Sequence, residues 1–228
     1  MIHSAYEINQ YVIFKYQEEW QEGRIVDIVV SDSSEKDNRT YYKVLSLSTL
    51  LEVPTLLYDH ILQNNSDNIK KIKVGFEKIP VSKELRALIE EDKAMASTNK
   101  VYRTDVHLGI VFEDFSAFLI SNKLYLSKEE ILLSTEGLKH IFNDLVEKVL
   151  LTVKEVKYFD SIKRKEDGSY YTKFGIVYGI RVAYYVLKDF LEKMNDPEVR
   201  FLLFEFIVYF LDFCGLNLSK YYNKKYYE

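Results

Sequence analysis

The sequence predicts an α+β protein of two domains, in which a small N-terminal β domain precedes an all-helical domain. Apolar and polar residues alternate with a period of two along much of residues 11–30, whereas from Pro80 onward the apolar residues recur with helical spacing. The 228 residues are 47% hydrophobic and 29% charged, which is enough apolar material for one large core or two modest cores. We place the boundary at residue 72, giving domains 1–72 and 73–228.

The β domain is predicted to contain three strands. The first two are marked by Tyr11, Ile13, Ile25, Ile28 and Val30, and the polar stretch QEEWQEG connects them. A turn over residues 31–38 leads to a third strand in NRTYYKVLSL, and Val53 with Pro54 closes the β-rich part. The polar, weakly patterned residues 63–73 suit a linker.

Five amphipathic helices are predicted in the second domain. Ser82 can cap the first, which runs through Met95, and Asp196 followed by Pro197 is a strong start for the last. The other apolar stripes cover residues 108–119, 138–149 and 176–191. Ser127 and Glu130 offer a capping box for a short turn before the third helix.

Composition excludes several classes of protein. The net charge of -4 and the pI near 5.7 provide no whole-chain attraction to nucleic acid. Cys214 is the only cysteine, so an intramolecular disulfide is impossible, and we expect a reducing, intracellular compartment without a signal peptide. The apolar run 201–214 is too short to span a bilayer and contains Glu205 and Asp212, which predicts a buried core helix and no membrane association.

Residues with catalytic or metal-binding chemistry form no recognisable motif. The four histidines lack short metal-ligand spacings, and the chain has no phosphate loop and no nucleophile elbow. An enzyme would need Glu90, Glu91, His107 or His140 to converge in one concave site. We therefore predict a protein that is not an enzyme and that uses no metal and no cofactor.

Several helical segments resemble, in order and spacing, the MRG (mortality factor-related) family of chromatin proteins. IPVSKELRALIEEDKAM at residues 79–95 looks like the family's Ile-Pro followed by an acidic helix, and VFEDF from Val111 resembles its Ile-Leu-Glu-Asp-Tyr segment. GLKHIFNDLVEKVLLTVKEVKYF at residues 137–159 is similar to a family run of Gly, Phe, paired Leu and Glu. Tyr171 and LLFEFIVYFLDF from Leu202 resemble the last two long helices.

The resemblance implies a nuclear, non-catalytic adaptor that joins subunits of histone acetyltransferase or deacetylase complexes. In this family the helical MRG domain presents an apolar groove to segments of partner subunits, a mode that needs apolar anchors in surface pockets. By position, the groove would be lined by Leu85, Leu88, Ile89 and Phe115. The alternative for these four residues is ordinary core packing. Leu88 and Lys93 stand where the family usually has tryptophans, so partner preference is expected to differ.

The β domain resembles the family's chromo barrel, a small SH3-like barrel that reads methylated lysine. Residues 6–26 look like its first two strands, and residues 41–54 look like the strand and turn that follow. Of the aromatic cage only Tyr42 remains, because Gln21, Leu45 and Thr49 occupy the other aromatic positions. A residual cage would consist of Tyr16, Trp20 and Tyr42. Since a cation needs several enclosing rings, we expect weak or no binding of a methylated histone tail.

A second hypothesis makes the barrel a nucleic-acid-binding module attached to a helical interaction domain. Small barrels can present basic side chains to phosphates, and the candidates are Lys15, Arg24, Lys36 and Arg39. Such binding would weaken steeply as the salt concentration rises.

Overall fold

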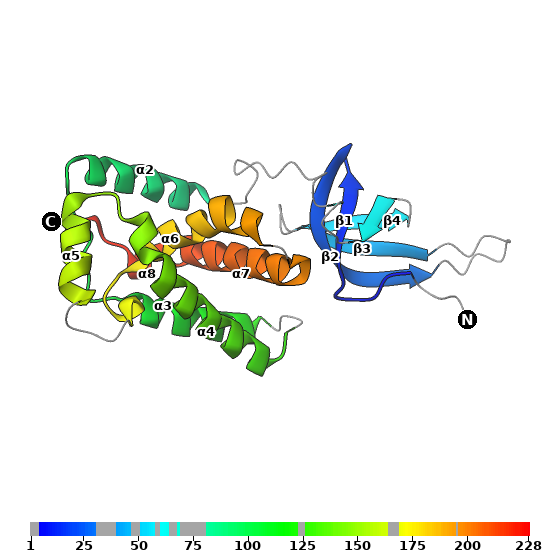
Figure 1. Cartoon of the computed structure of the whole chain (residues 1–228). Helices are drawn as coiled ribbons and strands as arrows, with labels where there is room; N and C mark the ends of the chain where they lie inside the picture. The colour runs from blue at the N-terminus through cyan, green and yellow to red at the C-terminus, as the bar shows by residue number, and fades with distance from the viewer. Residues whose placement is uncertain are drawn as a thin grey trace. The chain divides into compact units, whose positions relative to one another are not determined.

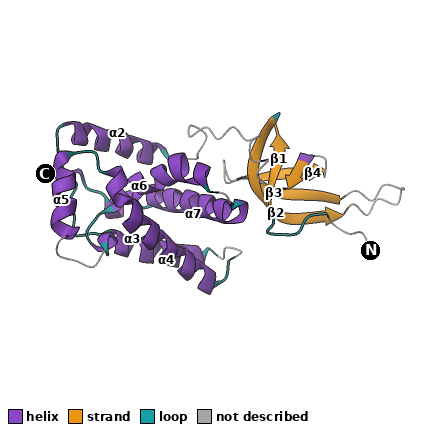
Figure 2. Cartoon of the chain, in the orientation of Figure 1, coloured by secondary structure: helices purple, strands orange, loops and turns teal. Residues whose placement is uncertain are grey.

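The fold has two parts along the chain, an N-terminal antiparallel sheet and a helical region (Figures 1 and 2). The computed structural model describes residues 5–30, 40–46, 51–57, 60–63, 68, 81–122, 126–163, 169–194 and 196–228. The chain divides into two compact units, which we call the β unit (residues 1–80 and 193–208) and the helical unit (residues 81–192 and 209–228). The α+β layout therefore agrees with the sequence prediction. The predicted boundary at residue 72 and the predicted turn over 31–38 lie outside the described residues.

Five antiparallel strands make up the sheet. They are β1 (Tyr11–Tyr16), β2 (Glu19–Val30), β3 (Thr40–Ser46), β4 (Glu52–Leu57) and β5 (Ile61–Gln63), in the spatial order β4-β3-β2-β1-β5. The sheet thus continues past Val53 and Pro54, where the sequence pattern placed its end. The last strand returns to the first, with Val12 opposite Gln63 and Phe14 opposite Ile61.

A tight two-residue turn joins β1 to β2. Gln17 and Glu18 both adopt the left-handed region, with φ values of 49° and 66°, as a turn that matches the twist of two antiparallel strands requires. The prediction that all of QEEWQEG is a connection is wrong, because Glu19 through Gly23 already pair with β1. Trp20 therefore lies in a strand, opposite Lys15.

The inner face of the sheet carries the core of the β unit. Its buried members are Tyr6, Val12, Phe14, Ile25, Tyr42, Val44, Val53, Leu56 and Ile61. Gly23 lets two strands approach closely here, since a Cβ at this position would lie 2.5 Å from Val44 Cγ1 and 2.8 Å from the Leu45 carbonyl oxygen.

Seven α-helices are present in the described part of the chain. They are α2 (Lys83–Ser97), α3 (Leu108–Ser121), α4 (Lys128–Leu145), α5 (Val153–Lys163), α6 (Ile176–Tyr185), α7 (Pro197–Leu216) and α8 (Leu218–Tyr221). Ser82 caps α2 as predicted, accepting a hydrogen bond from Leu85 N at 3.1 Å. The capping box of Ser127 and Glu130 begins α4 itself and not a separate turn, and α5 follows where no separate helix was predicted.

Aromatic and small residues fill the core of the helical unit. Phe115 contacts Phe210 and Phe213, with ring centroids 5.4 and 5.5 Å apart. Gly179 allows α6 to approach α3, because a Cβ there would lie 2.5 Å from Leu108 Cδ2.

The apolar helix α7 is largely buried, as its sequence predicted. Its residues up to Val208 belong to the β unit and those from Tyr209 onward to the helical unit. Among the described helices, none is by itself long and apolar enough to cross a membrane; only Val199–Leu216 together with Leu218–Tyr226, bent by 76°, reaches that length and composition.

Candidate functional site

The three residues predicted to form a residual methyl-lysine cage do not share one face of the sheet. Tyr16 and Tyr42 border the inner core of the β unit. Trp20 pairs with Lys15, and since side chains alternate along a strand, it points to the outer face. The described residues therefore do not enclose a single pocket with these three rings.

Tyr42 is the one aromatic residue that matches the family's cage, and its ring is part of the core. It is 1% exposed and packs edge-to-face against Tyr6 at 5.5 Å. Gln21, at another cage position, accepts a hydrogen bond from Ser46 Oγ at 2.9 Å, and Thr49 lies outside the described residues. A ring buried in this way has no open face to offer a cation.

The outer face of the β1–β2 hairpin is covered by the first part of α7, through two buried ion pairs. Glu22 binds Arg200 at 2.7 Å, and Arg24 Nε binds Glu205 at 3.2 Å. Tyr11 also donates a hydrogen bond to Glu205. All four charged residues are at most 7% exposed, and burial raises the pKa of the Glu22 carboxyl. Because each charge has a partner of opposite sign, the pairs fix how this helix segment lies on the hairpin.

These pairs bear on the hypothesis of a nucleic-acid-binding barrel. Arg24, one of its four basic candidates, is buried against Glu205 and donates to Asn9 Oδ1 at 3.0 Å. Lys15 pairs with Glu18 at 2.6 Å on the surface, while Lys36 and Arg39 lie outside the described residues. Arg24 is therefore not available to a phosphate group in this structure.

The four residues predicted to line a partner groove are mostly inside the helical unit. Leu85, Leu88 and Phe115 are at most 3% exposed, which agrees with the alternative of core packing. Ile89, which follows Leu88 on α2, is half-buried and keeps an accessible side chain. Of the four, Ile89 alone can contact a partner without a rearrangement of the core.

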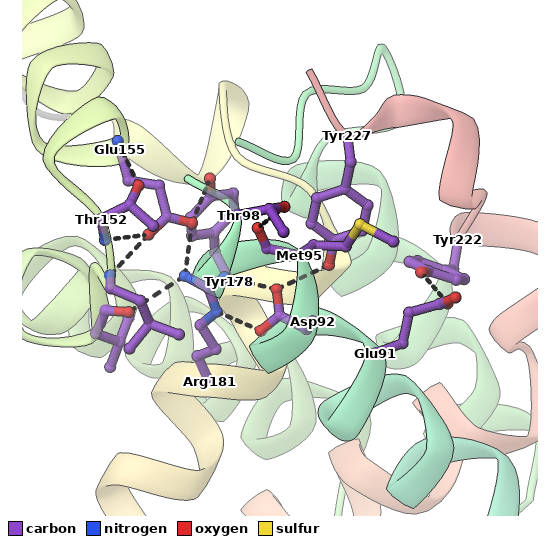
Figure 3. Close-up of polar contacts among 12 residues, drawn as sticks. Glu91, Asp92, Met95, Thr98, Thr152, Glu155, Tyr178, Arg181, Tyr222 and Tyr227 are labelled. Atoms are coloured by element: carbon purple, nitrogen blue, oxygen red, sulfur yellow. Dashed lines mark hydrogen bonds and ion pairs between the residues drawn. The ribbon is translucent and has the colours of Figure 1, made fainter. Parts of the chain in front are cut away.

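A network of buried charges in the helical unit is centred on Arg181 (Figure 3). From α6, the guanidinium of Arg181 forms two hydrogen bonds with the Asp92 carboxylate on α2, at 2.7 and 2.6 Å. It also donates to Glu155 Oε1 on α5, at 2.8 Å, and to the Val149 carbonyl oxygen, at 3.3 Å. This planar fork satisfies two carboxylates from two helices at once. Burial alone would lower the pKa of Arg181, but the two carboxylates raise it above its usual value.

Glu155 ties the start of α5 to this network, as Figure 3 shows. Its Oε2 accepts hydrogen bonds from the backbone N–H groups of Leu151 and Thr152, at 2.6 and 3.1 Å. Its Oε1 also accepts from the Tyr178 hydroxyl at 3.3 Å. The side chain is fully buried, so these donors and Arg181 offset the cost of removing the carboxylate from water.

Tyrosine hydroxyls complete the network. Tyr227 donates to Asp92 Oδ1 at 2.7 Å, and burial raises the pKa of both Tyr178 and Tyr227 well above the usual range for tyrosine. Burial likewise raises the pKa of the neighbouring Tyr102 to about 12. These phenols therefore stay protonated at physiological pH and act as hydrogen-bond donors.

Residues 218–228 are packed onto the helical unit by charged and aromatic contacts. Tyr222 donates to Glu91 Oε2 at 2.5 Å, and Lys224 forms an ion pair with the same carboxylate. Lys224 has the larger effect and Tyr222 the smaller, and together they hold the pKa of Glu91 below its ordinary value. The backbones of Val101 and Glu228 exchange two hydrogen bonds of 2.9 and 3.0 Å. The stretch SKYYNKKYYE is thus an integral part of this unit and not a loose basic tail.

Two of the four groups that an enzyme would need are engaged by other side chains. Glu90 pairs with Lys93 at 3.0 Å, and Glu91 is held by Tyr222 and Lys224. His140 is exposed on α4, whereas His107 precedes α3. In the described ranges, no group of three or more His, Cys, Asp or Glu side chains could hold a metal ion.

The Arg181 network was not found from the sequence, although one signal for it was present. Asp92 continues the buried stripe of Leu85 and Leu88 on α2, at a spacing where an apolar residue is expected. A carboxylate in that position predicts a buried cationic partner.

Comparison with known proteins adds no relative, because no family model and no curated protein matches this chain.

Proposed function

We propose that this chain is a non-catalytic adaptor of the MRG type, which joins subunits of a nuclear histone acetyltransferase or deacetylase complex. On this proposal the sheet is a divergent chromo barrel and the helical region is an MRG domain. The observation that carries the proposal is the order of the family-like segments, which extends over a chain with the expected layout of a sheet followed by helices.

The positions of these segments in the helices support the proposal. VFEDF lies within α3, and LLFEFIVYFLDF lies within α7. The run 137–159 covers the second half of α4 and most of α5. Glu155, part of the family-like run, is one of the two buried carboxylates that bind Arg181. Apolar residues recur in the core of most helical proteins, whereas a fully buried carboxylate is rare. A shared Glu at this position therefore supports the resemblance more strongly than shared apolar residues do.

The polar chemistry of the helical unit also fits an adaptor. Asp92, Glu155 and Arg181 are saturated by one another and by backbone or phenol donors. Groups engaged in this way hold helices in place and present a rigid surface, which lowers the entropic cost of binding a partner. Protein partners are therefore expected to dock on the outside of this framework, with Ile89 as the accessible member of the predicted groove.

The barrel is proposed to contribute little or no methyl-lysine reading. Tyr42 is buried against Tyr6, and Trp20 projects from the other face of the sheet. In a titration with histone peptides, we expect the same weak signal for trimethylated and unmethylated lysine. A clear affinity that depends on methylation would contradict this part of the proposal.

Affinity purification of the tagged full chain from its own cells, followed by mass spectrometry, tests the adaptor function. We expect acetyltransferase or deacetylase subunits with the wild type and fewer of them with Ile89→Glu, because a charge at this site opposes apolar docking. Leu133→Glu, at an exposed leucine of α4, is the matched control. Recovery of no such subunit with the wild type would contradict the proposal.

A further inference from the structure

The start of α5 exposes aliphatic side chains that have no role in the core. Leu151 is 54% exposed, Val153 is 68% exposed and Val156 is 45% exposed. Val153 and Val156 are one helical turn apart, and the opposite face of the same helix buries Glu155, Phe159 and Ile162. These three aliphatic side chains form the apolar part of a surface that we call the α5 patch.

Basic side chains accompany the aliphatic ones. Lys148, Lys154 and Lys157 are exposed, and none of them forms an ion pair with any residue of the described ranges. The nearby Glu147 is engaged with Lys163 at 3.7 Å. The α5 patch is defined by these three lysines together with Leu151, Val153 and Val156. Asp160 is the exposed acidic residue of α5 itself, so the three lysines outnumber it and leave this surface positive, in contrast to the net charge of -4 of the whole chain.

The backbone beneath the α5 patch is fixed from inside. The carboxylate of Glu155 binds the N–H groups of Leu151 and Thr152, and Arg181 holds that carboxylate. Figure 3 shows this buried anchor at the beginning of the helix. A surface held in place before binding loses little conformational entropy when a partner docks.

We infer that the α5 patch is a docking site for an acidic, amphipathic segment of a partner protein. The inference deepens the proposed adaptor function and rests on it for the presence of protein partners. Apolar side chains of the segment would cover Leu151, Val153 and Val156, while its Asp and Glu side chains would meet the three lysines. Charge complementarity of this kind favours correct partners and speeds their encounter.

A peptide fits the α5 patch better than an anionic membrane does. A membrane surface presents negative charge over a wide plane, so it would also repel the net negative charge of the chain. A peptide is small enough to contact the α5 patch alone. Salt screens its interaction with negative charges of the chain that lie more than about 8 Å away. The patch also contains no aromatic side chain, whereas helices that lie in a membrane interface commonly carry Trp or Phe.

Selection from a display library of random peptides on the purified full chain tests this inference. We expect the selected peptides to combine Asp or Glu with Leu, Ile or Phe. A synthetic peptide with the selected consensus, measured by fluorescence polarisation, should bind about tenfold more weakly to Val153→Ser/Val156→Ser. Lys154→Glu/Lys157→Glu should weaken binding similarly, and added salt should weaken it in the wild type.

Two variants control for nonspecific effects, and circular dichroism checks that every variant is folded. Leu133→Ser removes an equally exposed apolar side chain elsewhere, and Lys100→Glu reverses an exposed charge elsewhere. Both should bind like the wild type. The inference is overturned if no peptide is selected, if the consensus lacks acidic residues, or if the α5 patch variants bind normally. Binding to phosphatidylserine vesicles through these residues, without peptide binding, would also overturn it.

The outcome can be separated from that of the proposed function. Peptide binding by the α5 patch together with a purification that yields no histone-modifying subunit would leave a docking site on a different kind of adaptor. Recovered subunits that are equally abundant with the wild type and with Val153→Ser/Val156→Ser would support the adaptor and contradict the α5 patch.

Discussion

Replacing Arg181 by methionine is expected to destabilise the helical unit severely. The substitution keeps an unbranched apolar stem but removes the guanidinium that contacts Asp92 at 2.6 and 2.7 Å and Glu155 at 2.8 Å. Two carboxylates, 5% and 0% exposed, would then remain in the interior without their cation. Removing one partner of a buried ion pair typically costs about 3 to 5 kcal/mol.

The remaining donors reduce this cost but do not abolish it. Glu155 would keep two backbone N–H groups and the Tyr178 hydroxyl, and Asp92 would keep the Tyr227 hydroxyl. We therefore expect a loss near the lower end, about 3 kcal/mol in the free energy of unfolding. With a urea dependence of about 2 kcal/mol/M, the midpoint of unfolding should fall by about 1.5 M.

Urea unfolding followed by circular dichroism at a helical wavelength measures this change. Fluorescence of Trp20, the only tryptophan, provides a separate signal from the β unit. Arg86→Met, on the exposed side of α2, is the control and should leave the midpoint nearly unchanged. A midpoint for Arg181→Met equal to that of the control would refute the assignment of this network as the internal support of the helices.

Three further predictions concern other parts of the chain. Gln17→Asn combined with Glu18→Gly should raise the melting temperature by about 3 °C, because these residues suit the left-handed turn; an unchanged or lower melting temperature would contradict the turn geometry. Arg200→Met should cost about 3 kcal/mol in urea unfolding, because it leaves the Glu22 carboxylate buried alone, whereas a neutral effect would show that this pair is solvated. Because Lys224 and Tyr222 lower the pKa of Glu91 in the fold, its stabilisation is present above its ordinary pKa of 4.5 and is lost as the pH falls through the lower, folded value. The protection of residues 222–228 against hydrogen exchange, corrected for the intrinsic pH dependence of exchange, should therefore fall on acidification in the wild type but not in Glu91→Gln, and equal profiles would contradict the contact.

Elements with strong local signals were predicted well from the sequence. Ser82 precedes an amphipathic stripe and caps α2 as expected, and the long apolar run after Pro197 forms the buried helix α7. In both cases the local chemistry and the tertiary environment favour the same conformation. The two-part order of sheet and helices follows from the change in period near Pro80.

Features without a recognisable local signal were missed. Nothing local to Gln17 and Glu18 signals a tight turn, because the usual Asn-Gly pair is absent, so Trp20 was placed in a connection. The strand β5 has only three residues and is stabilised by pairing with β1. Arg24 was a candidate for phosphate binding, whereas it and Glu22 have partners of opposite charge on α7.

In the candidate site, too, the sequence predicted what local spacing determines and missed what depends on tertiary packing. The spacing of Leu85, Leu88 and Ile89 correctly indicated one side of a helix, but spacing alone does not distinguish a groove from a core. Burial of Leu85 and Leu88 favours the core for those two residues. The exposure of Val153 and Val156 was equally invisible in the sequence, because an apolar helical residue is normally expected inside.

The most direct test of the central claim compares histone-modifying activity in two preparations. The tagged full chain purified from its own cells should carry acetyltransferase or deacetylase activity on histone substrates, and Ile89→Glu should carry markedly less. The same chain purified alone from a bacterial host should have neither activity, since we propose that it is an adaptor. Activity in the isolated chain, or no activity with the wild-type complex, would contradict the account.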